Sequence, residues 1–240
     1  VTSVALTIND GTFTSNTATD DGGALYLGGF SALTLEDNEI KDNEADNGGA
    51  AYVGAISDIV AVRNVFCSND AINDLSTGNG GGLYLDTVLG TTKKYLKNNI
   101  LHDNTADGNG GGVWVTDSDL AFINNHFVGN EAGTYGGGLR NHNSTIEFRN
   151  NLVMSNINYG VYSTSITDTF DYNAFYNNDT GNLYGVTVGA NSFDTDPILT
   201  DWTDNDICDD ELWPHPLSPL IDEGDPDAAY DDPDGSNNDI

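Results

Sequence analysis

Aromatic side chains recur at one fixed place in this sequence, shortly after runs of small residues. These runs open the stretches GGALYL, GGAAYV, GGGLYL, GGGVWV and GGGLRN. The equivalent positions are Tyr26, Tyr52, Tyr84, Trp114, Arg140 and, one repeat later, Tyr162; we call these six residues the aromatic column. Exposed aromatic rings suit the apolar faces of sugars or the edge of a protein partner, so the column is our candidate ligand-binding site. The alternative is that stacked rings only stabilise a sheet by packing on their neighbours.

Carboxylates crowd the C-terminal end, where DEGDPDAAYDDPDGSNND holds eight acidic residues within 18 positions. Carboxylates this close repel one another if the segment folds, and a hard divalent cation removes that cost. The candidate calcium ligands are Asp225, Asp227, Asp232, Asp234 and Asp239. Gly235 suits the sharp turn of a calcium loop, but the stretch lacks the bidentate Glu of an EF-hand and contains Pro233. A solvated acidic tail is the alternative.

Cys67 and Cys208 are the only two cysteines of the chain. Cys67 follows a large apolar residue that is expected to face inward, so Cys67 itself is expected to face outward. A disulfide between the two would staple the C-terminal tail to the third repeat in an oxidising compartment. The alternative is a pair of free thiols.

The remaining reactive side chains do not assemble into a catalytic set, and we predict no catalytic residue. A polysaccharide lyase needs a basic residue beside calcium-binding carboxylates, and a glycoside hydrolase needs two facing carboxyl groups. The basic residues are Lys41, Arg63, Lys93, Lys94, Lys97, Arg140 and Arg149. Arg140 is the best candidate base, but its neighbours Trp114 and Tyr162 bring no carboxylate. The histidines, at positions 102, 126, 142 and 215, occupy unlike places in their repeats, so we expect them on the solvated surface.

A second motif recurs in step with the glycine runs and reveals the elements that must position these residues. It reads Asn or Gly, any residue, a large apolar residue, two further residues and Asn, as in NEIKDN and NHFVGN. The apolar anchors are Phe13, Ile40, Phe66, Leu101, Phe127, Val153 and Phe175, which are 27, 26, 35, 26, 26 and 22 residues apart. A unit of this length cannot bury a face alone, so seven units must stack on one another.

Each unit offers three short alternating segments separated by corners rich in Gly and Asn, without helical periodicity. This pattern predicts an all-β fold, a right-handed parallel β-helix of about seven turns in which each strand pairs with its equivalent one turn later. Residues expected to point inward after the glycine runs are Leu25, Ala51, Leu83, Val113, Leu139, Val161 and Val186, with Thr187 outward in the last turn. The final asparagines of the second motif, Asn16, Asn43, Asn69, Asn104, Asn130, Asn156 and Asn178, are expected to stack as a ladder.

The combination of GGAL and GGAA with FTSN, FCSN and FVGN resembles the repeat of the chlamydial-type polymorphic outer membrane proteins. Similar repeats occur in secreted bacterial β-helix proteins, and the segment SPLIDEGDP resembles the segment that follows such helices. The resemblance covers most of the chain. It implies a β-helical surface adhesin, although the membrane-barrel domain of that family is not found in this sequence.

Charge and proline divide the chain into two parts, a β-helix over residues 1–190 and an acidic capping segment over residues 191–240. The second part holds all 6 prolines and no Lys or Arg, so regular strands cannot continue and the tail is expected to cap or wrap the helix. Its apolar residues are Phe193, Ile198, Leu199, Trp202, Ile207, Leu212, Trp213, Leu217, Leu220 and Ile221, which give it area to dock.

The net charge of −31 disfavours nucleic acid and anionic lipid as partners, and no apolar run approaches the length of a membrane span. We therefore expect an extracellular or cell-surface protein of bacterial type, adhesin-like or structural, that binds a glycan or a surface protein through the aromatic column. Self-assembly through the N-terminal turn is a further expectation, because Leu6 and Ile8 have no polar cap before them. The alternative function is a carbohydrate-active β-helix enzyme, a polysaccharide lyase or hydrolase.

Overall fold

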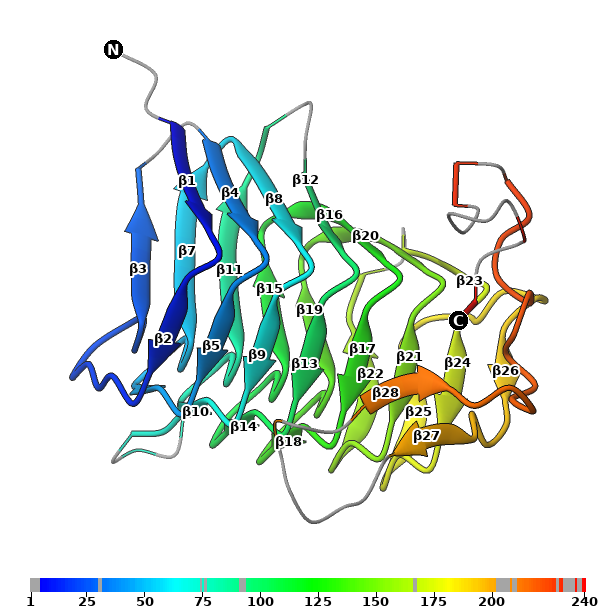
Figure 1. The fold of residues 1–240 in the computed structure, drawn as a ribbon. Coiled ribbons are helices and arrows are strands. Elements are labelled where there is room, and N and C mark those ends of the chain that lie inside the picture. The colour runs from blue at the N-terminus through cyan, green and yellow to red at the C-terminus, as the bar shows by residue number, and fades with distance from the viewer. Residues whose placement is uncertain are drawn as a thin grey trace.

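The computed structural model is a parallel β-solenoid of seven turns, and it describes residues 5–29, 32–73, 75, 77–90, 94–165, 168–201, 208, 211–227, 229–230, 236 and 239–240. Three long sheets run along the solenoid axis and form its walls (Figure 1). The described residues form no helix, and so none that is long and apolar enough to cross a membrane.

Each of the three long sheets takes one strand from every turn, and a short sheet takes one strand from four of the turns. The first sheet contains β1 (Ala5–Asn9), β4 (Ala32–Glu36), β8 (Asp58–Val62), β12 (Lys94–Lys97), β16 (Asp119–Ile123), β20 (Thr145–Arg149) and β23 (Thr169–Asp171). The second contains β2 (Thr12–Thr14), β5 (Glu39–Lys41), β9 (Val65–Cys67), β13 (Ile100–His102), β17 (His126–Val128), β21 (Leu152–Met154), β24 (Ala174–Tyr176) and β26 (Phe193–Asp194). The third contains β3 (Leu25–Gly28), β7 (Ala51–Ile56), β11 (Leu83–Val88), β15 (Val113–Thr116), β19 (Leu139–His142), β22 (Tyr159–Ser163) and β25 (Gly181–Tyr184). The short sheet contains β6 (Glu44–Ala45), β10 (Asp70–Ala71), β14 (Thr105–Ala106) and β18 (Glu131–Ala132).

Every strand of these sheets pairs in parallel with its equivalent one turn away, as the repeat spacing predicts. In the first sheet Thr7 pairs with Thr34, and the column continues through Val60, Tyr95, Ala121, Glu147 and Thr169. The 35-residue repeat keeps this register because its extra residues lie in loops outside the strands. The three strands per unit predicted from the sequence are confirmed, and the short sheet adds a fourth strand in four turns.

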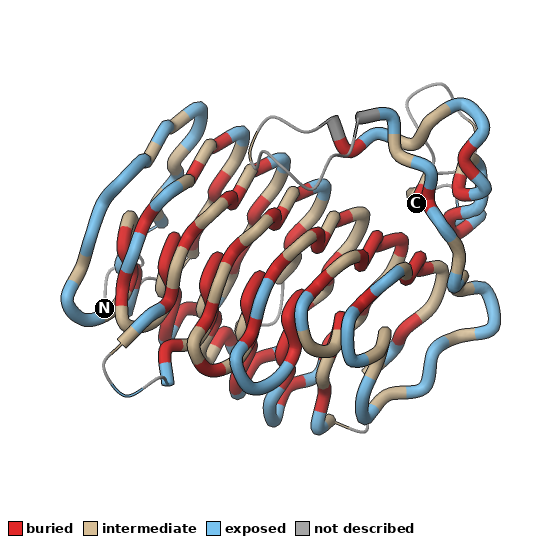
Figure 2. The backbone as a smooth tube through the Cα atoms, turned by 90° about the horizontal axis from the view of Figure 1, so that it is seen from below, coloured by how far each residue is buried: buried red, intermediate tan, exposed pale blue. Residues whose placement is uncertain are grey.

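The core is a continuous stack of aliphatic and phenylalanine side chains inside the three walls. Buried positions recur along the length of the solenoid (Figure 2). The predicted apolar anchors from Ile40 to Phe175 are buried in it, and Phe13 packs against it at the N-terminal end. The prediction for the last turn is wrong, because Leu183 rather than Val186 pairs with Val161. The last unit is short and lacks a glycine run, so nothing in its residue pattern marks the register there.

The predicted asparagine ladder is present at the corner that follows the second sheet. Asn104 Nδ2 donates to Asn130 Oδ1 at 2.9 Å, and the same bond links each neighbouring pair from Asn16 to Asn178. A second ladder, which the sequence analysis did not assign, joins Asn38, Asn64, Asn99, Asn125, Asn151 and Asn173 at the corner before the second sheet. Both ladders are largely buried, and they satisfy backbone N–H and C=O groups where the chain turns.

The glycine runs form the corner before the third sheet. Gly110 has a positive φ of 66°, and a Cβ on Gly111 would lie 2.3 Å from the carbonyl oxygen of Glu131 in the next turn. The positive φ favours glycine at the first position, and the close backbone contact leaves no room for a side chain at the second. The repetition of the glycine run is therefore a requirement of stacking and not a nucleotide-binding loop.

The described part of the C-terminal tail lies against the outer face of the second sheet. Its antiparallel hairpin of β27 (Leu199–Asp201) and β28 (Glu211–Pro214) crosses in front of this sheet (Figure 1). Leu212 and Leu220 pack there with Val128, Met154 and other outward residues of the second sheet in a separate apolar cluster. The tail is thus a strap along the side of the solenoid, and β26 extends the second sheet by one strand.

One disulfide and one set of polar contacts hold the tail against the solenoid. The Sγ atoms of Cys67 and Cys208 form a disulfide 2.06 Å long, which ties the tail to the third turn. Near the other end, the Arg149 guanidinium pairs with the Asp225 carboxylate, and the Asp225 backbone N–H donates to Asn150 Oδ1 at 2.9 Å.

The apolar residues of the tail do not all dock. Leu212 and Leu220 are buried, whereas Trp213 and Leu217 are 69% and 77% exposed. Trp202 and Ile207 lie outside the described residues. The predicted docking of the tail therefore uses Leu212 and Leu220, and Trp213 and Leu217 take no part in it.

Candidate functional site

The aromatic column lies on the outer face of the third sheet, one residue per strand. Register pairs place Tyr26 beside Tyr52, then Tyr84, Trp114, Arg140 and Tyr162 in consecutive turns. Alternation along each strand turns these side chains outward, because their neighbours in sequence point into the core. Tyr184 continues the column in the last turn, where Thr187 was expected.

The N-terminal half of the column is a stack of rings. Tyr26 and Tyr52 are parallel with ring centroids 5.3 Å apart, and Tyr84 and Trp114 stack at the same separation. Between the two pairs, Tyr52 and Tyr84 meet edge to face at 4.9 Å. Partial burial and nearby carboxylates raise the pKa of Tyr84 to about 12, and burial together with a hydrogen bond to Asp86 raises that of Tyr52 further. These hydroxyl groups are therefore neutral at any physiological pH.

The C-terminal half combines rings with a guanidinium. Tyr162 and Tyr184 stack with centroids 4.3 Å apart, and Tyr135 lies beside Tyr162 at 4.4 Å. The guanidinium carbon of Arg140 lies 4.6 Å from the Tyr162 ring centroid, within range of a cation–π interaction. Arg140 holds its predicted outward place in the column, but its side chain is buried and only 8% exposed. The rings on either side cover it.

Exposure is uneven along the column. Tyr26 is 62% exposed and Tyr184 is 47% exposed, whereas the four residues from Tyr52 to Arg140 are half-buried or buried. Neighbouring rings cover one another's faces, so the middle of the column presents mainly ring edges. The open ring surface lies at the two ends of the column.

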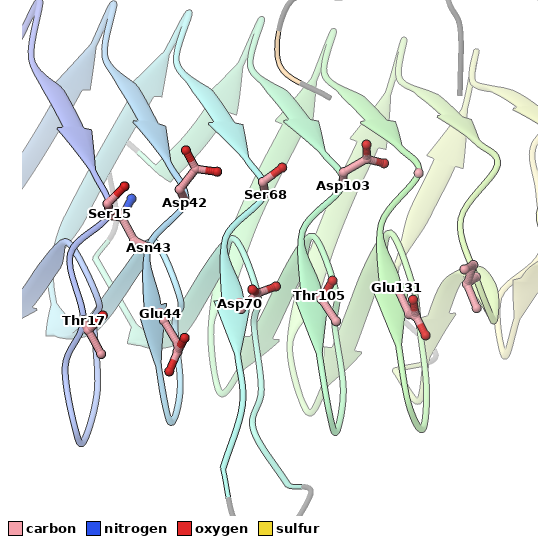
Figure 3. Close-up of a pocket in the computed structure, with 12 residues that line it drawn as sticks. Ser15, Thr17, Asp42, Asn43, Glu44, Ser68, Asp70, Asp103, Thr105 and Glu131 are labelled. Atoms are coloured by element: carbon pink, nitrogen blue, oxygen red, sulfur yellow. The ribbon is translucent and has the colours of Figure 1, made fainter. Parts of the chain in front are cut away.

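A second candidate site, which the sequence analysis missed, is a groove of about 640 Å³ on the side formed by the second and short sheets. Figure 3 shows two rows of polar side chains along it. One row contains Ser15, Asp42, Ser68 and Asp103, and the other contains Thr17, Glu44, Asp70, Thr105 and Glu131. These are the residues that flank each asparagine of the first ladder. That adjacency was a signal in the sequence, because the ladder fixes where its two neighbours point.

The carboxylates of this acidic groove influence one another. Glu44 and Asp70 are register partners on adjacent strands, and Thr105 follows in the next turn. Burial and the nearby charges of Glu44 and Asp42 raise the pKa of Asp70, although a hydrogen bond with Thr105 acts in the opposite direction. Asp70 therefore holds its proton more readily than an isolated aspartate does.

The predicted calcium ligands are not brought together by the described part of the tail. Asp225 pairs with Arg149, and Asp239 Oδ1 accepts a hydrogen bond from the Asp222 backbone N–H at 2.8 Å. Asp227 Oδ1 accepts a bond from the backbone N–H of Ala229 at 3.0 Å. Asp232 and Asp234 lie outside the described residues. Within the residues that are described, three or more His, Cys, Asp or Glu side chains do not converge into a group able to hold a metal ion.

Two histidines depart from the solvated surface predicted for all four. His102 is buried on the outer face of the second sheet, where it pairs in register with Cys67. The ring nitrogen Nδ1 of His126 is shut off from solvent and has no hydrogen-bond partner among the described atoms. Burial lowers the pKa of His126 to about 4, so the ring is neutral at physiological pH.

The fold and the repeat spacing agree with a comparison against known families. Residues 2–180 match the family described as a right handed beta helix region, and this chain belongs to that family. Searches of curated proteins and of solved structures gave no match. The family is defined by its fold, which adhesins and carbohydrate-active enzymes share, so the function must be argued from the sites.

Proposed function

We propose that this β-helix is a carbohydrate-binding module that holds a linear glycan along the aromatic column. The observation that carries the proposal is the column itself, in which aromatic or stacked side chains occupy the same outward position of seven consecutive strands. An oligosaccharide lying parallel to the axis would meet one such side chain every ~4.8 Å, the spacing of neighbouring strands. Sugar rings have apolar faces that pack on aromatic surface.

The setting we propose is extracellular or cell-surface, with an adhesin-like role. Three features support it: the disulfide, which persists in oxidising compartments, the large negative charge, and the likeness of the repeat to that of surface adhesins. A surface protein is the other partner that an exposed aromatic face can accept.

Binding to a glycan array tests this function. We expect binding by the unaltered protein and its loss in a double variant, Tyr26→Ala with Tyr184→Ala, because these two rings are the most exposed of the series. Tyr95→Ala is the matched control, since Tyr95 also faces outward but lies on the first sheet. Equal glycan binding by the double variant and the control would overturn the proposal. Capture of a protein ligand in place of glycans would favour the other partner class.

The acidic groove supports a second candidate function, glycoside hydrolysis. Glu44 and Asp70 are register partners on adjacent parallel strands, whose backbones lie ~4.8 Å apart, and both side chains line the groove. Two carboxyl groups that face one cleft are the minimum set of a glycoside hydrolase. The raised pKa of Asp70 suits a general acid, and Glu44 would then be the nucleophile. A reducing-sugar assay over neutral and acidic polysaccharides tests this candidate, with an unsaturated-uronate assay to detect a lyase. Turnover that is lost in both Asp70→Asn and Glu44→Gln would establish it, and the absence of turnover would remove it.

A further inference from the structure

Arg140 differs from most of the described basic residues in having no acidic partner. Of the six Lys and Arg residues that the structure describes, Lys41, Arg63, Lys94 and Arg149 each have a carboxylate oxygen within 4.0 Å. Among those described residues Lys97 and Arg140 have none, and Lys97 is more exposed. A buried, uncompensated guanidinium is unexpected in a chain of net charge −31, where carboxylates outnumber basic groups.

The hydrogen bonds of the Arg140 side chain are incomplete. Nη1 donates to the backbone carbonyl of Asn141 and, at 3.3 Å, to that of Tyr162. Nε and Nη2 have no acceptor among the described atoms. Burial lowers the pKa of Arg140, an effect that the hydroxyls of Tyr162 and Tyr135 oppose, and the group stays charged at any physiological pH. The guanidinium therefore keeps unused donors for a planar acceptor such as a carboxylate.

A second unused donor lies on the neighbouring strand. Trp114 is the register partner of Arg140, and its Nε1–H is enclosed without any hydrogen-bond partner. Buried indole N–H groups usually have an acceptor, since leaving one unsatisfied costs free energy. The Trp114 N–H is enclosed and does not itself reach the surface, so Arg140 is the donor of this pair that a ligand can meet.

We propose that Arg140, with Trp114 beside it, is an anion subsite within the aromatic column that takes the carboxylate of an acidic sugar. The inference rests on the proposed glycan-binding function and narrows its ligand to a glycan that contains a hexuronic acid. The anion binds the Nε and Nη2 side of Arg140, while Tyr162 supports the guanidinium from its face. Because the net charge of the protein repels anions at long range, an acidic sugar is held only where a cationic group without a carboxylate partner, such as Arg140, is present.

Titration calorimetry with matched oligosaccharides tests the subsite. The probes are tetrasaccharides of galacturonate, glucuronate, mannuronate and guluronate, each paired with its carboxyl-reduced, neutral counterpart. We expect at least one acidic tetrasaccharide to bind about tenfold more tightly than its reduced form, the gain of one charge-assisted hydrogen-bonded pair. Arg140→Gln should abolish that preference, and Lys97→Gln, which removes the same charge elsewhere, should keep it.

Two more variants protect the test against a folding defect. Arg140→Lys retains the charge but loses the planar fork, so it should keep the fold and lose most of the preference. Trp114→Phe keeps a ring beside Arg140 and removes only an enclosed N–H, so we expect it to leave the preference unchanged.

The outcomes separate the subsite from the function on which it rests. Equal binding of acidic and reduced forms, or an undiminished preference in both Arg140 variants, overturns the anion subsite and leaves glycan binding intact. If no tetrasaccharide of either form binds, the subsite is also overturned. The array result with Tyr26→Ala and Tyr184→Ala then decides separately whether the column binds any glycan.

Discussion

The same repeat builds the outer faces of the second and third sheets, but the two faces carry different side chains. Aliphatic residues such as Val128, Leu152 and Met154 line the outer face of the second sheet, and the tail buries them. The outer face of the third sheet carries aromatic rings and Arg140, and Tyr26 at its end is largely open. The chain therefore covers one outer face and leaves the other to stabilise itself by ring stacking. An uncovered face with stacked rings is what a binding surface requires.

Removing the disulfide should have the largest effect, because it releases the covered face. We expect Cys67→Ala with Cys208→Ala to lower the free energy of unfolding by about 5 kcal/mol, since the bond closes a loop over a sequence separation of 141. Urea denaturation measured by circular dichroism gives this value. Reduction of the unaltered protein should reproduce it. A loss below about 1 kcal/mol would mean that the apolar contacts hold the tail without the bond.

Met154→Ala tests burial beneath the tail. Met154 is fully buried in the apolar cluster, so its truncation should cost about 2 to 5 kcal/mol in the free energy of unfolding. The measurement is again urea denaturation. A cost as small as that of a surface substitution would show that the tail does not cover this face in solution.

Acid should lower the free energy of unfolding through His126, which lies on the outer face of the second sheet. Its pKa is about 4 in the folded protein and 6.5 in the unfolded chain, so the unfolded state takes up the proton first as pH falls. The stability due to neutral His126 is complete above pH 6.5 and declines towards pH 4, by at most about 3 kcal/mol. We compare unfolding curves of the unaltered protein and of His126→Phe across this pH range. The difference between them separates the contribution of His126 from that of the carboxylates, which both proteins share. Parallel pH profiles would contradict it.

Tyr26→Ala should have the smallest effect on stability, because most of its side chain is already in water. We expect a loss below about 1 kcal/mol, the value of its stacking contact with Tyr52. Tyr84 and Trp114 are half-buried between their neighbours, so their replacement should cost more than that of Tyr26. Thermal unfolding of the three single variants checks this order, and equal losses would remove the distinction between the ends and the middle of the column.

The sequence predicted the solenoid well because stacking imposes the same demand on every turn. The anchors from Phe13 to Phe175 and the first ladder follow from spacing alone, since a shifted register would turn a whole strand inside out. The exposure of Arg140 could not be predicted, because it depends on Tyr135, a residue outside the column that lies against Tyr162. The position of the tail could not be predicted either, because each of its contacts occurs once and leaves no repeating pattern in the sequence.

The two long asparagine ladders give the solenoid an electrical polarity. At each step of both ladders, the Nδ2 group of one asparagine donates to the Oδ1 atom of the asparagine one turn nearer the C-terminus, from Asn16 to Asn178 and from Asn38 to Asn173. A shorter row of Asn47, Asn79 and Asn109 points the other way and offsets part of the sum. Aligned amide dipoles add head to tail, as they do along a helix axis, whereas the backbone dipoles of a sheet largely cancel. The positive end of this net dipole lies toward the C-terminal turns, where the Asp225 carboxylate of the tail is held against Arg149.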